Sequence, residues 1–247
     1  MTAGKGRYHA QELLPFWGSG GQERLAKSAV LIAGCGGLGG HAATLLARAG
    51  VGHMRLVDHD TPELSNLHRQ VLFFEQDVRD GTAKAVAAAD VVRRANSDIV
   101  VDARVEEINA QSLENLLDGI DLVVDATDNF PTRFALNEAC VRRNVPWIYG
   151  GAVGTSGSVM VIVPRDGPCL RCVYPQDPDE SAIPHSSRNG IIGTLPAIVA
   201  AQQATEALRL LLGEPVDCSV MRLFDIWEKR YETLALKRQP ACPVCGG

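Results

Sequence analysis

Short apolar, β-branched runs alternate with longer amphipathic segments from residue 28 to about residue 163. A short apolar run is typical of a buried strand, and apolar positions recurring every three or four residues are typical of a helix with one buried face. The alternation therefore predicts an α/β fold, with a mostly parallel sheet and helices on both faces. The expected strands are 29–34, 54–58, 99–105, 122–126 and 147–149, and the expected helices are 38–49, 83–95, 111–117 and 133–143.

The pattern changes in the last third of the chain. Residues 158–163 predict another strand, whereas residues 173–190 are polar, contain three prolines and show no apolar period. Loops of this length are uncommon in compact domains unless they are functional or mobile. A buried helix is expected over 195–212, and the strands 220–224 and 231–236 are expected to extend the sheet in antiparallel fashion.

Composition narrows the function classes. At 247 residues and 46% apolar content, the chain can bury one large core. A net charge of −5 without a clustered basic face argues against nucleic-acid binding, so proteins or small anions are the expected partners. The late apolar segment 193–213 carries Gln202, Glu206 and Arg209, so no membrane span is expected. Seven cysteines without a secretion signal favour thiols or metal ligands in the cytoplasm.

A glycine-rich turn follows the first expected strand directly. Gly36, Gly37 and Gly39 stand between that strand and the next expected helix, and the second strand ends at Asp58. Glycines there let backbone N–H groups approach a phosphate, and the helix N-terminus adds partial positive charge. An acidic side chain at the end of the second strand reaches a ribose hydroxyl. This dinucleotide-binding fingerprint of a Rossmann-like sheet serves NAD and ATP enzymes alike, so an NAD-dependent oxidoreductase is one interpretation.

The residues after the ribose-binding position favour a triphosphate. Asp60 follows at once, and two cations, Arg69 and Lys84, come soon afterwards. A triphosphate needs such charges, whereas a nicotinamide ring does not. The fourth expected strand leads into Asp128, a carboxylate at the ligand-binding edge that is suited to Mg²⁺. Taken singly, the two cations also fit a solvated surface, and Asp128 also fits the N-cap of the following helix.

The cysteines form two C-x₂-C pairs, which are Cys169 with Cys172 and Cys242 with Cys245. Four thiolates complete a tetrahedral zinc site and leave no open position, so the predicted metal is structural and ties the end of the chain to the segment after residue 163. A redox dithiol would explain one pair but not two. The other cysteines lie in apolar or glycine-rich contexts and are expected to be buried small side chains: Cys35, Cys140 and Cys218.

The order of these motifs resembles the adenylation domain of the ThiF/MoeB/HesA family, which is related to the ubiquitin-activating enzymes. The resemblance runs from residue 7 to residue 245 and is slightly closer to ThiF. It is carried by Gly-Cys-Gly-Gly-Leu-Gly at 34–39, Leu-Val-Asp-His-Asp at 56–60, Leu-Ser-Asn-Leu-His-Arg-Gln at 64–70, Lys84, and Asp-Ala-Thr-Asp-Asn at 125–129. It implies one adenylation domain over 1–247, with an N-terminal helical segment (1–28), a nucleotide-binding sheet (29–164) and a C-terminal part with the zinc knuckle (165–247).

The resemblance also implies an activity. Such an enzyme uses ATP and Mg²⁺ to convert the C-terminal Gly-Gly carboxylate of a ubiquitin-like sulfur carrier, ThiS-like or MoaD-like, into an acyl-adenylate, and it releases pyrophosphate. The products serve thiamine or molybdopterin biosynthesis, and the enzyme is expected to be a homodimer. Catalysis would rest on positioning and charge neutralisation. The implied contacts are Gly37 at the phosphates, Asp58 at the ribose, Ser65, Asn66 and Arg69 around the phosphate chain, Lys84 at the β- and γ-phosphates, and Asp128 on Mg²⁺ beside Asn129.

The chain departs from the family pattern in the polar loop. Many relatives carry a cysteine there, which can form a covalent linkage with the carrier. Residues 173–190 contain no cysteine, and Pro184, His185, Ser186 and Ser187 occupy the region. We therefore expect the reaction to stop at the acyl-adenylate, with a separate persulfide donor supplying the sulfur.

A second departure lies near the N-terminus. The family pattern Arg-Tyr-x-Arg-Gln reads Arg7-Tyr8-His9-Ala10-Gln11 here, and the missing arginine normally reaches the ATP of the partner subunit. Loss of such a cation can cost several powers of ten in rate. Full activity would then need Arg7, His9 or Arg24 as a substitute. A non-catalytic, carrier-binding member of the family is the alternative that this departure leaves open.

Overall fold

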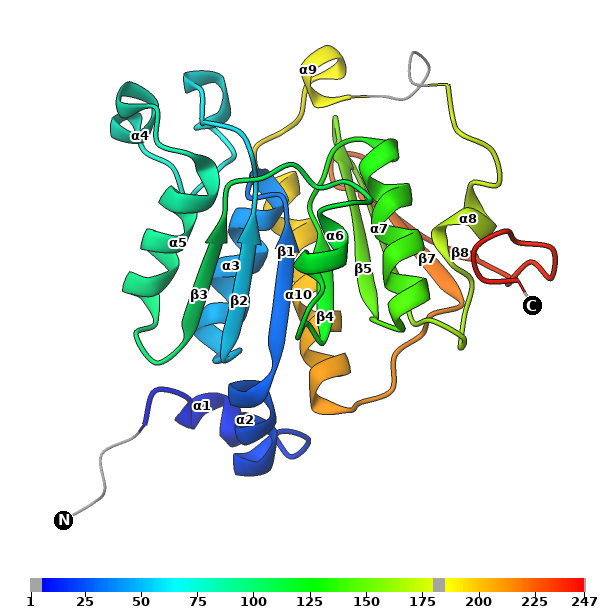
Figure 1. The fold of residues 1–247 in the computed structure, drawn as a ribbon, viewed down its shortest axis with the longest axis horizontal. Helices are drawn as coiled ribbons and strands as arrows, with labels where there is room; N and C mark the ends of the chain where they lie inside the picture. The colour runs from blue at the N-terminus through cyan, green and yellow to red at the C-terminus, as the bar shows by residue number, and fades with distance from the viewer. Residues whose placement is uncertain (1–5, 180–184, 247) are drawn as a thin grey trace.

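The computed structural model of this protein describes residues 6–179 and 185–246 (Figure 1). Within these residues, one eight-stranded sheet has the order β3-β2-β1-β4-β5-β6-β7-β8. The first five strands along the chain are parallel, and the last three are antiparallel, so the predicted fold class is confirmed. The strands are β1 (Ala29–Ala33), β2 (His53–Val57), β3 (Val100–Arg104), β4 (Leu122–Asp125), β5 (Trp147–Val153), β6 (Ser156–Ile162), β7 (Val220–Asp225) and β8 (Arg230–Ala235).

Helices cover both faces of the parallel part of the sheet (Figure 1). Side chains of α3, α5 and α10 form one apolar cluster with the sheet, and those of α6 and α7 form the other. β1 and β4 are buried along their whole length, as central parallel strands must be. The helices are α1 (His9–Glu12), α2 (Gly18–Lys27), α3 (Gly37–Ala49), α4 (Glu75–Asp80), α5 (Lys84–Ala95), α6 (Leu113–Leu116), α7 (Phe130–Arg143), α8 (Leu170–Val173), α9 (Ser186–Asn189) and α10 (Leu195–Leu212), with a 3₁₀ turn η1 (Leu64–Asn66).

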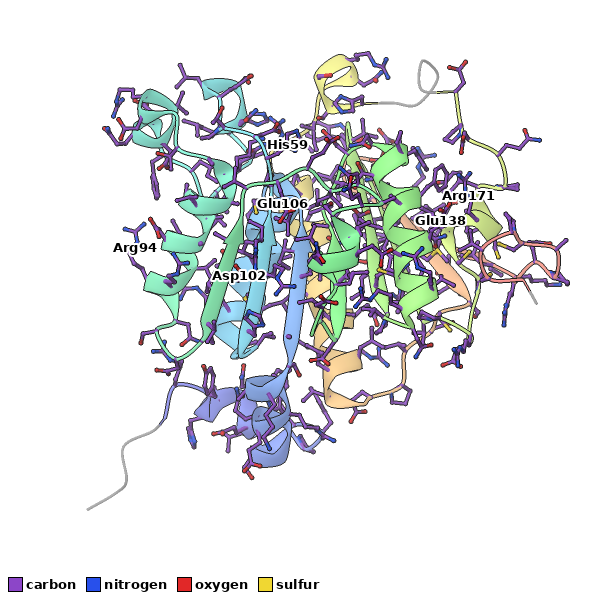
Figure 2. The ribbon with its side chains drawn as sticks, viewed as in Figure 1. His59, Arg94, Asp102, Glu106, Glu138 and Arg171 are labelled. Atoms are coloured by element: carbon purple, nitrogen blue, oxygen red, sulfur yellow. The ribbon has the colours of Figure 1, made fainter. Side chains whose placement is uncertain are left out.

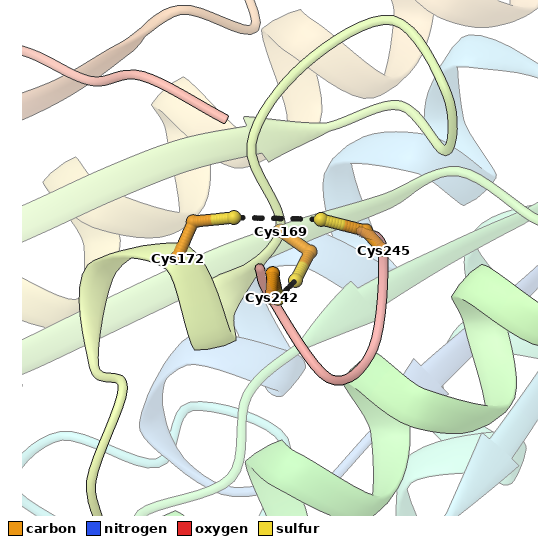
Figure 3. Close-up of side chains that lie close together, drawn as sticks. All are labelled: Cys169, Cys172, Cys242 and Cys245. Atoms are coloured by element: carbon orange, nitrogen blue, oxygen red, sulfur yellow. Dashed lines mark hydrogen bonds between the residues drawn. The ribbon is translucent and has the colours of Figure 1, made fainter. Parts of the chain in front are cut away.

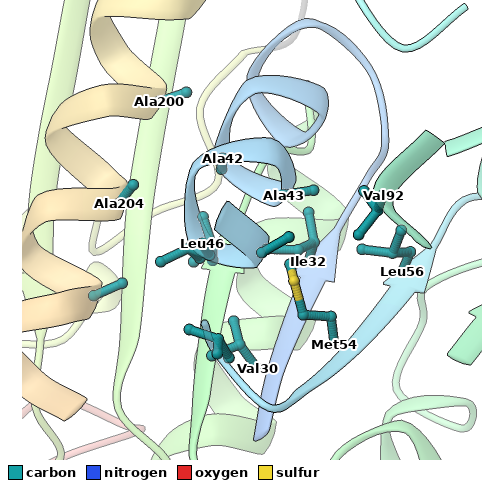
Figure 4. Close-up of a cluster of buried hydrophobic side chains, with 14 of the residues drawn as sticks. Val30, Ile32, Ala42, Ala43, Leu46, Met54, Leu56, Val92, Ala200 and Ala204 are labelled. Atoms are coloured by element: carbon teal, nitrogen blue, oxygen red, sulfur yellow. The ribbon is translucent and has the colours of Figure 1, made fainter. Parts of the chain in front are cut away.

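Figure 4 shows why α3 can lie so close to the sheet. Its inward residues, Ala42, Ala43 and Leu46, are buried against β1, β2 and α10. At its first turn, a Cβ on Gly39 would lie 1.9 Å from the carbonyl oxygen of Gly34. Only glycine permits that approach, so Gly39 sets the distance between the helix start and the end of β1.

Several element boundaries differ from those expected. β5 continues from the expected end at residue 149 to Val153, because its small residues pair with β6. α7 begins at Phe130 rather than residue 133, because Asn129 caps it and Pro131 suits its first turn. The short helix α4 was not expected. The polar loop 173–190 contains α9 in its described part, and residues 180–184, Pro184 among them, lie outside the described residues.

Different helices lie at the two ends of the parallel strands. The helices α1 and α2 lie at the amino-terminal edge of the sheet, and α9 lies across the opposite edge (Figure 1). Over residues 6–179 and 185–246, none of the helices has both the length and the apolar character that crossing a membrane requires.

Candidate functional site

A large cavity opens at the carboxyl edge of the sheet. Its volume is about 1230 Å³, and it runs from the glycine-rich turn to the antiparallel strands β7 and β8. Ligands of open α/β sheets bind at this edge. Of the predicted site residues, the cavity is lined by Gly36, Gly37, Asp58, Asp60, Arg69, Lys84, Asp128 and Asn129.

Asp58 holds the glycine-rich turn in place. One carboxylate oxygen accepts a hydrogen bond from the backbone N–H of Cys35 (2.7 Å), and the other accepts from that of Asp60 (2.9 Å). Burial raises the pKa of Asp58, while these two N–H donors and the nearby Lys84 act to lower it. The carboxylate is thus fixed at the mouth of the turn, where a ribose hydroxyl is expected.

Lys84 is buried rather than solvated. Its side chain stands at the first turn of α5 with 8% of the residue exposed, and its Nζ lies 2.9 Å from Oδ2 of Asp60. The backbone N–H of Lys84 also donates to the carbonyl of Asp60 (2.8 Å). The interpretation of Lys84 as a surface cation is therefore wrong, because the fold pairs it with a carboxylate from the segment that follows β2 and turns it into the cavity.

Arg69 lines the cavity, and its neighbours shape the turn that carries it. Its Nη1 donates to the carbonyl of Ser65 (3.0 Å). Ser65 donates its hydroxyl to Glu63 (3.1 Å), and the side chain of Asn66 accepts from the backbone N–H of Glu63 (3.1 Å). In the described part of the chain, Ser65 and Asn66 are outside the set of residues that line the cavity. Their contacts with a phosphate chain therefore stay a prediction.

Asp128 is free of the helix-capping role. Asn129 is the N-cap of α7, and its side chain accepts from the backbone N–H of Thr132 (2.9 Å). The reading of Asp128 as that cap is thus wrong by one residue. The Asp128 side chain is 72% exposed, and its Oδ2 lies 3.2 Å from Nε2 of His185, which reaches the cavity from the start of α9.

The structure adds a buried ion pair that the sequence reasoning missed. Arg133 of α7 lines the cavity, and its Nε lies 3.3 Å from Oδ2 of Asp125 at the end of β4. In the sequence, the only local sign of this ion pair is that the carboxylate of Asp125 follows three apolar strand residues directly. Side chains from Tyr149 and Tyr174 line the same part of the cavity.

The four paired cysteines meet in space (Figure 3). The sulfur atoms of Cys169 and Cys242 are 3.6 Å apart, those of Cys172 and Cys245 are 3.4 Å apart, and all four lie within 4.8 Å of one another. A tetrahedral zinc with Zn–S bonds of about 2.3 Å separates its sulfurs by about 3.8 Å, so the cluster is compatible with zinc.

The thiols of this cluster sit in different surroundings. Burial raises the pKa of the Cys169 and Cys172 thiols. Burial acts in the same direction on Cys242, but the backbone N–H groups of Cys245 and Val244 outweigh it and lower the pKa of Cys242 to about 7. Outside the cluster, Cys35 and Cys140 are buried as expected, whereas Cys218 is only half-buried.

Ala10 lies far from the cavity of its own chain. It is exposed on α1, at the amino-terminal edge of the sheet (Figure 1). Arg7 is paired with Asp98, whose Oδ2 lies 3.1 Å from its Nε, at the same edge. Arg24 belongs to α2, which lies there too. A cation from this segment is therefore too far away to serve the cavity of its own chain (Figure 1).

Comparisons with known proteins match nearly the whole chain. The model of the ThiF family matches residues 8–244. The chain is 40% identical over 242 residues to the SAMP-activating enzyme E1 of Haloferax volcanii, covering 97% of this chain and 88% of the relative. It is also 40% identical to the sulfur carrier protein adenylyltransferase of Thermus thermophilus (97% and 90% covered) and to the sulfur carrier protein ThiS adenylyltransferase of Bacillus subtilis (98% and 71%).

A solved structure shares the fold. The crystal structure of E. coli MccB with ATP superimposes with a TM-score of 0.85 at 27% identity, covering 99% of this chain and 75% of MccB. The family match spans the glycine-rich turn, the cavity residues at the carboxyl edge and three of the four paired cysteines, and it ends one residue before Cys245. The chain belongs to the ThiF family.

Proposed function

We propose that this chain is a single adenylation domain that uses ATP to activate the C-terminal Gly-Gly carboxylate of a ubiquitin-like sulfur carrier. The observation that carries the proposal is the continuity of the cavity, which joins the glycine-rich turn to the surface of β7 and β8. In one half, the glycine-rich turn and the cations Arg69 and Lys84 can bind a nucleotide. The other half offers a path for an extended peptide, with Arg230 and Glu232 at its far end.

The residues have distinct roles in this proposal. Gly36 and Gly37 receive the phosphates, Asp58 binds the ribose, and Arg69 and Lys84 neutralise the triphosphate. Ser65 and Asn66 order the turn that carries Arg69. Because they lie only a few residues before Arg69, we propose that they add further contacts to the phosphate chain. Because Lys84 is already desolvated beside Asp60, its charge acts on a bound phosphate in a low-dielectric environment.

The reaction needs no protein nucleophile. A carboxylate oxygen of the carrier attacks the α-phosphorus of ATP, the bond to the bridging oxygen of pyrophosphate breaks, and the carrier acyl-adenylate remains. Asp128 would hold Mg²⁺ beside Asn129, and the metal would supply charge neutralisation on the phosphates. An exposed carboxylate without a capping duty fits that role. The Cys169, Cys172, Cys242 and Cys245 cluster would hold a structural zinc.

Two features bear on partners. The polar loop contains no cysteine, so a separate persulfide donor would act on the adenylate. The segment after α1 exposes Leu13 (70%) and Phe16 (53%), and such apolar side chains favour a homodimer that covers them.

The cysteine pairs also bear on the compartment. A reducing cytoplasm keeps the two pairs as thiols that can bind zinc, so this compartment suits the protein.

Two alternatives are weaker. A nicotinamide-dependent oxidoreductase would share the glycine-rich turn, but the relatives named above are adenylyltransferases or an activating enzyme. A carrier-binding member without turnover is favoured by Ala10 and by the cysteine-free loop. The buried Lys84 and the fixed Asp58 argue against it, since neither is needed to bind a carrier.

The test is direct loading of the carrier. Incubation with ATP, Mg²⁺ and either a ThiS-like or a MoaD-like carrier is expected to add one AMP to the carrier, seen by intact mass, and to drive carrier-dependent ATP–pyrophosphate exchange. A carrier lacking its last glycine is the control. The enzyme itself should gain no mass from the carrier, and a thiol-cleavable carrier adduct on the enzyme would contradict the absence of a covalent step. No adenylate on either carrier would reject the proposed function for these substrates.

A further inference from the structure

β4 and β5 separate at the floor of the cavity. The two strands pair at two positions, Val123 with Trp147 and Val124 with Ile148. β4 then ends, whereas β5 continues as the partner of β6. The end of β4 leads to Asp128 in the nucleotide half of the cavity, and the continuation of β5 builds the floor of the other half. The two halves therefore meet at a gap that strand pairing does not close.

The guanidinium of Arg133 spans that gap. Its Nη2 donates to the carbonyl of Thr127 (2.7 Å), just after β4, and to the carbonyl of Gly150 (3.0 Å) on β5. Its Nε faces the carboxylate of Asp125 at 3.3 Å, and its charge lies 4.8 Å from the centre of the Tyr149 ring. Nη2 alone contacts both carbonyls, and Nε, a separate nitrogen of the same planar group, faces Asp125, whereas a lysine has a single nitrogen and cannot occupy both positions.

Gln203 of α10 joins the same strands from the other face of the sheet. Its Nε2 donates to the carbonyls of Asp125 (2.7 Å) and Ile148 (3.1 Å). A Cβ at residue 150 would lie 2.4 Å from that nitrogen, so the amide reaches the strands only because residue 150 is glycine. The carboxylate of Asp125 is further fixed by the N–H (2.9 Å) and hydroxyl (2.6 Å) of Thr127.

Stability alone does not account for the ion pair. Asp125 is fully buried and Arg133 is 7% exposed. Taking two charges out of water offsets most of their attraction, so well-packed apolar residues would serve the core equally well. A geometric role explains the choice, because Arg133 contacts one backbone carbonyl from each half of the cavity.

We propose that Arg133 is a positioning residue for adenylation. By holding Thr127 and Gly150 together, it sets the separation between Asp128, in the nucleotide half, and the Gly150–Gly151 floor, on which the end of the carrier lies. This inference rests on the proposed function. Attack on the α-phosphorus is sensitive to such a separation, because a displacement of about 1 Å can cost about a hundredfold in rate.

The decisive variant is Arg133→Lys, which keeps a cation near Asp125 but has one nitrogen in place of the two that contact the carboxylate and the carbonyls. We expect kcat for carrier-dependent pyrophosphate exchange to fall about a hundredfold, while the Kd for ATP, measured by calorimetry without carrier, changes by less than about threefold. The matched control is Arg171→Lys. Arg171 lies on α8 outside the cavity, over the ring of Phe134 and beside Asp177, and should leave kcat and Kd unchanged (Figure 2).

Two results would overturn the inference. One is an unchanged kcat in Arg133→Lys, and the other is a parallel loss of kcat, ATP affinity and melting temperature, which marks a purely structural residue. If Arg133→Lys does not fold, the double variant Asp125→Asn with Arg133→Met removes both charges, and it must show the same split between kcat and Kd.

Hydrogen exchange separates failure of this inference from failure of the proposed function. If the parent chain adenylates no carrier, the proposed function fails, yet the amides of 126–129 and 150–151 should still exchange faster in Arg133→Lys than in the parent. Unchanged exchange at both segments would reject the bridging role whatever the substrate.

Discussion

At the scale of single residues, the site combines charges that differ in how far water screens them. Lys84 is buried, its partner Asp60 is half-exposed, and Asp128 is largely exposed. A buried cation acts strongly on a phosphate, whereas an exposed carboxylate can exchange its water for a metal. The neighbouring His59 is exposed at the same edge of the sheet (Figure 2).

Substitution of Lys84 by Met tests the first of these charges. We expect the exchange rate to fall by about two to three powers of ten, the loss typical of one preorganised donor at developing charge. The fold should survive, because Asp60 is left in contact with water. Lys27→Met, on the exposed face of α2, is the control. Steady-state exchange kinetics and melting curves check both, and a near-normal rate in Lys84→Met would remove Lys84 from the mechanism.

Restoring the arginine that the family pattern has at residue 10 tests whether the proposed partner subunit supplies a cation to the cavity. Ala10→Arg should raise kcat at least about tenfold, in the direction of the larger effects known for arginine fingers. The gain should disappear at protein concentrations where the dimer dissociates. Ala26→Arg adds a cation at the same edge on α2 and should give no gain. Equal rates for Ala10→Arg and the parent would mean that another group already supplies the charge.

At the scale of elements, the paired cysteines join two segments far apart in sequence. Cys169 is the N-cap of α8 and Cys172 lies within that helix, and the other pair follows β8. Because β8 is exposed along its whole length and, among the described residues, pairs only with β7, a metal in the cluster would add a second link between this end of the antiparallel sheet and the core. A bound metal therefore should contribute to folding as well as to local order.

Removal of the metal tests that role. The purified protein should contain about one zinc per chain, and Cys245→Ser should lose it and melt at a lower temperature. Cys218→Ser changes a half-buried cysteine outside the cluster and should keep the zinc. Elemental analysis and thermal melts give both readouts. A parent protein that melts identically with and without a strong chelator would show that the cluster carries no structural metal.

At the scale of the whole molecule, the proposed function has one cavity serve two ligands because two kinds of sheet meet beneath it. The parallel strands end at the half proposed for the nucleotide, and the antiparallel extension forms the half proposed for the carrier. The junction depends on Arg133 and Gln203, which replace strand pairing where β4 stops. Adenylation and tail binding are thus expected to be coupled through this junction.

The local patterns of the sequence determined the α/β alternation, the glycine-rich turn with Asp58, and the two cysteine pairs. These depend on residue period and short spacing, which are set along the chain. Only the tertiary structure decided that Lys84 is buried beside Asp60, that Asp125 faces Arg133, and that Ala10 lies opposite the cavity. Those contacts follow from the strand order and from where each helix crosses the sheet, and local periodicity does not encode which strands become neighbours.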